Sequence, residues 1–124
     1  MTTEQRPPLW VGHVVLHTNR MDDSAAFMRT IGMRPVFQGP AVTIFELRGG
    51  THLILLAKDD AKAGDASFDL MVEDLAATHR RFTELGLDPS PIESVPKIDH
   101  TLFRLREPAG NLITFYSSHV TGAV

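Results

Sequence analysis

The sequence contains no cysteine and no run of basic residues. The absence of cysteine excludes disulfides, thiolate nucleophiles and thiolate zinc sites, so any metal has to be held by His, Asp or Glu side chains. Lysine and arginine together number 12 against 15 acidic residues, which gives a net charge of −3. Proteins that bind the phosphate backbone of a nucleic acid normally carry a basic patch, so we expect no nucleic-acid partner.

Long hydrophobic runs are also absent. The longest aliphatic run, Leu53–Ala57, is far shorter than the ~20 residues that a membrane-spanning helix requires. Residues 1–8 are polar, end in two prolines, and contain neither the apolar segment nor the cleavage site of a secretory signal. We therefore expect a cytoplasmic protein without a membrane partner, in which residues 1–8 form a loose leader.

What the sequence does contain is an internal repeat. Three blocks recur in the same order: IGMRP at 31–35 as LGLDP at 85–89 (offset 54), TIFELR at 43–48 as TLFRLR at 101–106 (offset 58), and residues 50–56 as residues 110–116 (offset 60). Fixed order over three blocks predicts two copies of one structural unit. Residues 58–65 are the expected linker between them.

Each copy is predicted to fold as βαβββ. The alternation over His13–Thr18 is typical of a half-buried strand. Asp22 or Asp23 is then expected to cap a helix whose apolar positions share one face and which ends at Gly32. The other expected elements are strands at 33–38, 41–48 and 51–57, and in the second copy a strand at 67–73, a helix at 74–85 and strands at 92–95, 100–106 and 111–117.

These features resemble the vicinal oxygen chelate superfamily, which includes glyoxalases, extradiol dioxygenases, fosfomycin-resistance enzymes and bleomycin-binding proteins. The resemblance rests on the two units, on Gly-Met or Gly-Leu after each helix, and on Glu107-Pro108-Ala109-Gly110-Asn111 before the last strand. It implies an α+β fold in which units 9–57 and 66–119 form a curved mixed sheet with a cleft. A single domain over 9–119 is then followed by a tail at 120–124.

The resemblance also implies metal ligands on the first and last strands of each unit. In the first unit the first-strand position is His13, and the last-strand position is Ile54, or His52 if the inward-facing residue lies two residues earlier. In the second unit the two positions are Ser67 and Thr114. Either the chain holds one divalent ion, such as Fe, Mn, Ni or Zn, with His13 and His52 as its expected ligands, or it has no cofactor. Catalytic sites normally use three strong N or O ligands, so the family's ligand set is incomplete in this chain.

Other polar residues share the inward faces of these strands, because side chains two residues apart point the same way. Glu46 and Arg104 lie on matching strands, and we expect them either to pair across the cleft or to hold a polar substrate, with Arg104 suited to a carboxylate or phosphonate. Asp69 is an acid within an apolar strand, expected to act as a base or as the partner of Arg104. The substrate cleft is expected to be lined by His17, Ile54, Ser67, His100, Thr114 and Tyr116.

The residues favour a protein that binds a small polar or anionic molecule in the cleft between its two units, and they leave open whether it is an enzyme. The alternative is a divalent-metal-dependent lyase or dioxygenase of glyoxalase type that uses a shifted site made of His13, His52 and Glu46. A third hypothesis is metal-free acid–base catalysis by Asp69 or Glu46, with Arg104 holding an anion. By analogy with the family, a homodimer is expected.

Overall fold

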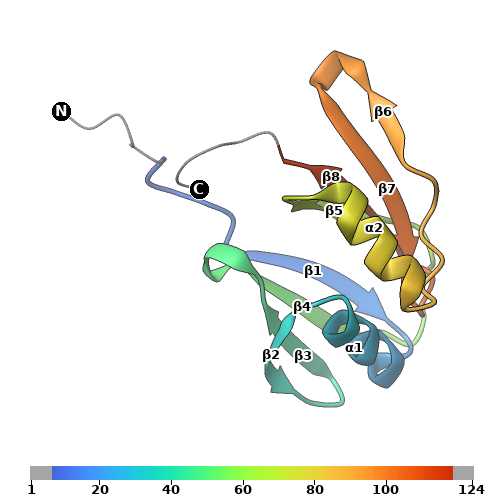
Figure 1. Cartoon of the computed structure of the whole chain (residues 1–124). Coiled ribbons are helices and arrows are strands. Elements are labelled where there is room, and N and C mark those ends of the chain that lie inside the picture. The colour runs from blue at the N-terminus through green and yellow to red at the C-terminus, as the bar shows by residue number, and fades with distance from the viewer. Residues whose placement is uncertain (1–6, 119–124) are drawn as a thin grey trace.

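Two units with the same element order make up the structure, as Figure 1 shows with the first unit in blue to green and the second in yellow to red. The computed structural model describes residues 7–118, so the expected tail at 120–124 and most of the expected leader at 1–8 lie outside the described residues. The first unit contains β1 (His13–Thr18), α1 (Met21–Thr30), β2 (Arg34–Gln38), β3 (Val42–Glu46), a 3-10 turn (Arg48–Gly50) and β4 (His52–Ala57). The second contains β5 (Asp65–Val72), α2 (Leu75–Glu84), β6 (Glu93–Val95), a 3-10 turn (Pro96–Ile98), β7 (His100–Arg106) and β8 (Leu112–Ser117). No helix within residues 7–118 is long and apolar enough to cross a membrane.

Both units build a four-stranded mixed sheet of the same topology. The strand orders are β1-β4-β3-β2 and β5-β8-β7-β6. In each sheet the first strand is parallel to the last, because the helix carries the chain back across the sheet, and the other neighbours are antiparallel. The predicted α+β fold of two βαβββ units is confirmed.

The two helices begin differently. The prediction that Asp22 or Asp23 caps the first helix is wrong: α1 begins at Met21, its N-cap is Arg20, and that position makes no side-chain capping bond. Both aspartates lie instead in the first turn, where a carboxylate interacts favourably with the helix dipole. In contrast, the side chain of Asp74 accepts a hydrogen bond from the Ala77 backbone N–H at 2.9 Å and so caps α2.

The core lies on one face of each sheet, beneath the helices. Buried and more exposed residues alternate along the strands, as the period of a strand requires. Leu53 and Leu55 on β4 and Ile113 and Phe115 on β8 are buried, and they belong to the same core cluster as Met28 of α1 and Phe82 of α2. The opposite face of each sheet, called here the cleft face, is free of helices and carries the predicted site residues.

A buried carboxylate joins the two units. Glu107, only 1% exposed, lies between β7 and β8 of the second unit. Its Oε1 accepts a 2.6 Å hydrogen bond from the Ser24 hydroxyl at the start of α1, and its Oε2 accepts bonds from the backbone N–H and the side-chain amide of Asn111 at 3.0 and 2.9 Å. Since the Ser24 proton is used there, the Thr18 hydroxyl donates to Ser24 Oγ over 2.7 Å. Thr18, Ser24, Glu107 and Asn111 are called here the inter-unit network.

Candidate functional site

Three of the predicted site residues share one row across the first sheet. His13 on β1 stands opposite His52 on β4, which stands opposite Glu46 on β3. The two imidazole rings are roughly stacked, with centroids 5.8 Å apart. The row continues to Arg34 on β2, a residue that the sequence did not indicate. The Arg34 guanidinium donates to Oε1 of Glu46, with the Nε bond at 2.9 Å.

This row does not fit a metal centre within one chain. Among residues 7–118, no group of three or more His, Asp or Glu side chains is placed to hold a metal ion. Glu46, the carboxylate nearest in register to the two histidines, is already paired with Arg34. A catalytic divalent ion normally takes at least three protein ligands, so the two histidines alone fall short of that set.

A second row crosses the other sheet. Asp69 on β5 stands opposite Thr114 on β8, which stands opposite Arg104 on β7. Asp69 is exposed to solvent, which agrees with a wet cleft face around an acid in an apolar strand. The partner of Arg104 is Glu93 on β6, at 2.9 Å between Nη1 and Oε2. Arg104 is therefore paired with neither Asp69 nor Glu46, because each sheet supplies an oppositely charged neighbour on its own edge strand.

The equivalence of Glu46 and Arg104 that the repeat suggested is shifted by two residues. Glu46 stands opposite His52 in the first sheet, whereas Arg106 stands opposite Leu112 in the second. The structural offset on this strand is therefore 60, the same as on the strands that follow, and Glu46 corresponds to Arg106. A shift of two keeps each side chain on the same face of the sheet, so Arg104 still lies on the cleft face.

The remaining predicted cleft residues lie along the same faces. Ile54 stands opposite Val15 and Ile44 and so belongs to the apolar middle of the first sheet's cleft face. The rings of Tyr116 and His100 meet edge to face at 5.4 Å. The Nδ1 atom of His100 lies 2.8 Å from the Ser117 carbonyl oxygen, which ties this histidine to the end of β8.

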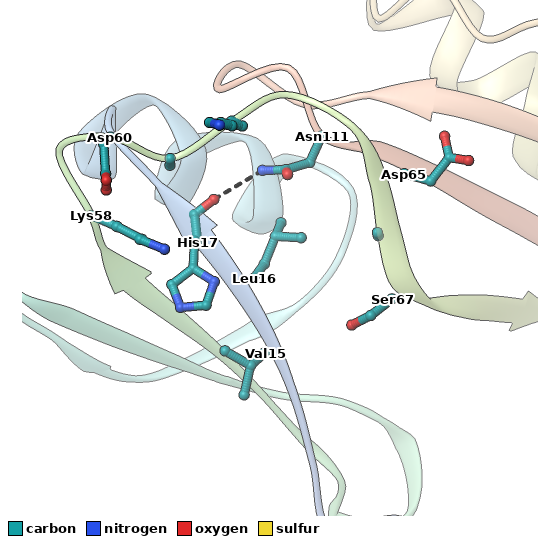
Figure 2. Close-up of a pocket in the computed structure, with 11 residues that line it drawn as sticks. Val15, Leu16, His17, Lys58, Asp60, Asp65, Ser67 and Asn111 are labelled. Atoms are coloured by element: carbon teal, nitrogen blue, oxygen red, sulfur yellow. Dashed lines mark hydrogen bonds between the residues drawn. The ribbon is translucent and has the colours of Figure 1, made fainter.

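A pocket of about 490 Å³ lies where β1 and β5 meet the linker between the units (Figure 2). It contains two predicted residues, His17 and Ser67, and its size is in the range of ordinary small-molecule sites. The lining residues are Val15, Leu16 and His17 of β1, Lys58, Asp60, Ala61 and Lys62 of the linker, Asp65, Ala66 and Ser67 of β5, and Asn111.

The inter-unit network shapes one wall of this pocket. The side-chain amide of Asn111 donates to the His17 carbonyl oxygen at 3.0 Å while it also donates to Glu107 (Figure 2 shows the first of these bonds). This links the turn before β8 to the end of β1. The buried Glu107 therefore holds the His17 backbone in place from the other unit.

Lys58, Lys62 and Asn111 were not predicted as site residues. Lys58 and Lys62 fall in the expected linker, and the sequence shows Asn111 only as part of a family-like turn. A signal did exist in the sequence: a linker that leaves the last strand of one unit and enters the first strand of the next has to pass the ends of both strands. Charged residues in such a short segment are therefore placed beside the cleft.

Comparisons with known proteins agree on the fold. Residues 10–115 match the model of the family described as Glyoxalase/Bleomycin resistance protein/Dioxygenase superfamily. None of the curated proteins is significantly similar in sequence. Among solved structures, lactoylglutathione lyase from Agrobacterium tumefaciens is similar with a TM-score of 0.77 and 21% identity, over 95% of this chain and 100% of that one.

The names of two further solved structures refer to a small molecule, bleomycin. A bleomycin resistance determinant encoded on the transposon Tn5 has a TM-score of 0.73 and 20% identity, over 90% of this chain and 100% of that one. A bleomycin-binding protein complexed with bleomycin has a TM-score of 0.70 and 20% identity, over 89% of this chain and 98% of that one. At sequence identities of 20% and 21%, these structural similarities show that the chains share a fold.

Proposed function

The chain belongs to the glyoxalase/bleomycin resistance protein/dioxygenase superfamily, and from that premise we propose that it binds a small polar or anionic molecule in the pocket between its two βαβββ units. The observation that carries the proposal is the pocket itself, which draws its lining from β1, β5 and the linker and presents His17, Lys58, Lys62, Ser67 and Asn111. A concave site with a few convergent polar groups is the usual form of a small-molecule site. The solved complex of a bleomycin-binding protein with bleomycin gives this fold a precedent for such binding.

A second candidate is metal-dependent catalysis at His13, His52 and Glu46. The shared row and the 5.8 Å separation of the two imidazoles favour it. The Arg34–Glu46 ion pair opposes it, since binding of an ion by Glu46 competes with that pair. The binding function ranks first because, in the described part of the chain, none of the residues that line its pocket has to give up an existing ion pair to hold a ligand.

The proposal is tested by ligand-induced thermal stabilisation with a set of small polar and anionic molecules. A ligand at about 100 times its Kd stabilises the native state by about 2.7 kcal/mol, so a clear rise in Tm is expected for wild type. Replacing Ser67 by tryptophan fills the pocket and is expected to abolish the rise. The matched variant Ser94→Trp, on the exposed edge strand β6, keeps it.

A chelator separates the two candidate functions. We expect EDTA to leave the Tm rise unchanged. If EDTA removes the rise, and if Mn, Fe, Ni or Zn binds stoichiometrically to wild type and not to His13→Ala, the metal-dependent function replaces the proposal. Equal stabilisation of wild type and Ser67→Trp would place the ligand outside this pocket.

We further propose that the chain forms a homodimer through its cleft faces. Large apolar side chains are exposed there, with Phe37 at 55% and Met71 at 53%, and Trp10 just before β1 is 70% exposed. A second copy that packs on these faces would cover these apolar side chains. Light scattering after size-exclusion chromatography is expected to give twice the 13.7 kDa mass of one chain, and Phe37→Glu is expected to shift it to a single chain. A single-chain mass for wild type contradicts the proposal.

A further inference from the structure

We propose that the linker end of the pocket recognises an oxyanion group of the bound molecule, a carboxylate or a phosphate, through the Lys58 ammonium and the His17 imidazole. This inference rests on the proposed function and adds a substrate class to it. Figure 2 shows the Lys58 side chain extending toward the ring of His17, at the side of the pocket formed by β1 and the linker. An ammonium and an imidazole that face the same space suit a negatively charged group.

The first argument is the distribution of paired charge. On the two cleft faces, Arg34 and Arg104 are each neutralised by an acid of their own sheet, Glu46 and Glu93, and Arg106 donates to the Gly110 carbonyl oxygen at 2.7 Å. Within residues 7–118, Lys58 makes no ion pair and its ammonium donates no hydrogen bond to a protein acceptor. An anion that enters the pocket therefore finds a cation that no acid of the described chain already satisfies.

The second argument is that the wall carrying Lys58 is held in place before any ligand arrives. The Lys58 backbone N–H donates to the Thr18 carbonyl at 2.9 Å, which extends the pairing of β1 with β4 by one residue. The Ala61 backbone N–H donates to the Lys58 carbonyl oxygen at 3.0 Å and closes a turn. At the far end of the linker, the Leu112 backbone N–H donates to the Gly64 carbonyl oxygen at 2.8 Å. A preformed wall lowers the entropy lost on binding.

The third argument is the position of the two acids of the pocket, Asp60 and Asp65, neither of which pairs with the Lys58 ammonium. Asp65 stands on the opposite side, and Figure 2 shows its carboxylate directed away from His17 and Lys58. Asp60 follows Lys58 closely in the linker but forms no ion pair with it. The pocket is thus polarised, with the Lys58 ammonium beside His17 on the β1 side and Ser67 and Asp65 on the β5 side. The ligand is expected to place its oxyanion at Lys58 and its neutral part along β5.

The test is an NMR titration of the full chain with inorganic phosphate, acetate and methylphosphonate at constant ionic strength, which removes general screening effects. Saturable shifts are expected at the amides of Val15, His17 and Ser67. Lys58→Gln is expected to weaken binding by about tenfold or more, the usual effect of losing one charge-assisted hydrogen bond. The matched variant Lys97→Gln, on an exposed turn, is expected to bind as wild type does. The relative affinities of the three anions tell a carboxylate site from a phosphate site.

A parallel titration with neutral polar fragments separates this inference from the function on which it rests. If neutral fragments shift the pocket amides while all three anions fail to do so, the oxyanion site is wrong and the binding function stands. If Lys58→Gln binds the anions as tightly as wild type, the oxyanion site is likewise wrong. If no anion and no fragment shifts these amides, the proposed function fails together with the inference.

Discussion

Replacing Glu107 by alanine is expected to lower the free energy of unfolding by about 3 kcal/mol, since an unsatisfied buried hydrogen-bonding group costs about 1–3 kcal/mol and three donors lose this acceptor. The donors are the Ser24 hydroxyl and the two N–H groups of Asn111. All of them lie where water has little access, because Ser24 is fully buried and Asn111 is 9% exposed. Urea denaturation followed by far-ultraviolet circular dichroism measures the loss.

Two variants make this test specific. Glu107→Gln keeps an acceptor oxygen at nearly the same place, so we expect it to lose less stability than Glu107→Ala. Glu93→Ala removes an exposed carboxylate that pairs with Arg104, and exposed ion pairs contribute about 0–1 kcal/mol. If Glu107→Ala loses no more than Glu93→Ala, the inter-unit network does not stabilise the fold in the way described.

Replacing Phe103 by alanine is expected to lower the free energy of unfolding by about 3–5 kcal/mol, the usual range for a buried phenylalanine in a packed core. Phe103 on β7 is completely buried. Its ring stacks on Phe115 with centroids 5.1 Å apart and meets Phe82 of α2 edge to face at 5.9 Å. The substitution therefore removes one of the aromatic contacts that hold α2 against its sheet, while Phe82 keeps its contact with Phe115 at 5.4 Å.

The matched substitution is Phe68→Ala on β5, which lies on the other side of β8 from β7. Phe68 is only partly buried at the edge of the same core, and the stabilisation from burial scales with the apolar area removed from water. A clearly smaller loss is expected. Phe103→Leu keeps most of the volume and is expected to cost less than about 1.5 kcal/mol. Equal losses for Phe103→Ala and Phe68→Ala would contradict the assigned core.

Replacing Glu107 by alanine is also expected to affect ligand binding. Asn111 donates both to Glu107 and to the His17 carbonyl, so loss of the carboxylate frees the group that positions the end of β1. Weaker ligand binding is expected in Glu107→Ala at temperatures where it is still folded. Phe103→Leu, on the far side of the second sheet from the pocket, is expected to bind normally. The stability of the two units and the shape of the pocket are thus coupled through one side chain.

The sequence by itself determined the repeat, the order of elements and the faces of the strands. These features depend on residues close together in the chain: the two-residue alternation of a strand, the helical spacing of apolar residues, and a glycine with positive φ after each helix, at +115° for Gly32 and +77° for Gly86. The row of His13, His52 and Glu46 also follows from these faces once the strands are paired. Periodicity could place these side chains on the cleft face before any register was known.

Only the tertiary structure decided which charges meet and where the pocket lies. A repeat match shifted by two residues preserves every face, so the sequence could not distinguish an offset of 58 from one of 60 on β3 and β7. The pairing of Glu46 with Arg34, and of Arg104 with Glu93, depends on which residues of neighbouring strands lie side by side. Lys58, Ser67 and Asn111 come together because three separate segments converge. The sequence places Lys58 in the linker near the strand ends, but only the tertiary structure brings it to the same pocket as Ser67 and Asn111.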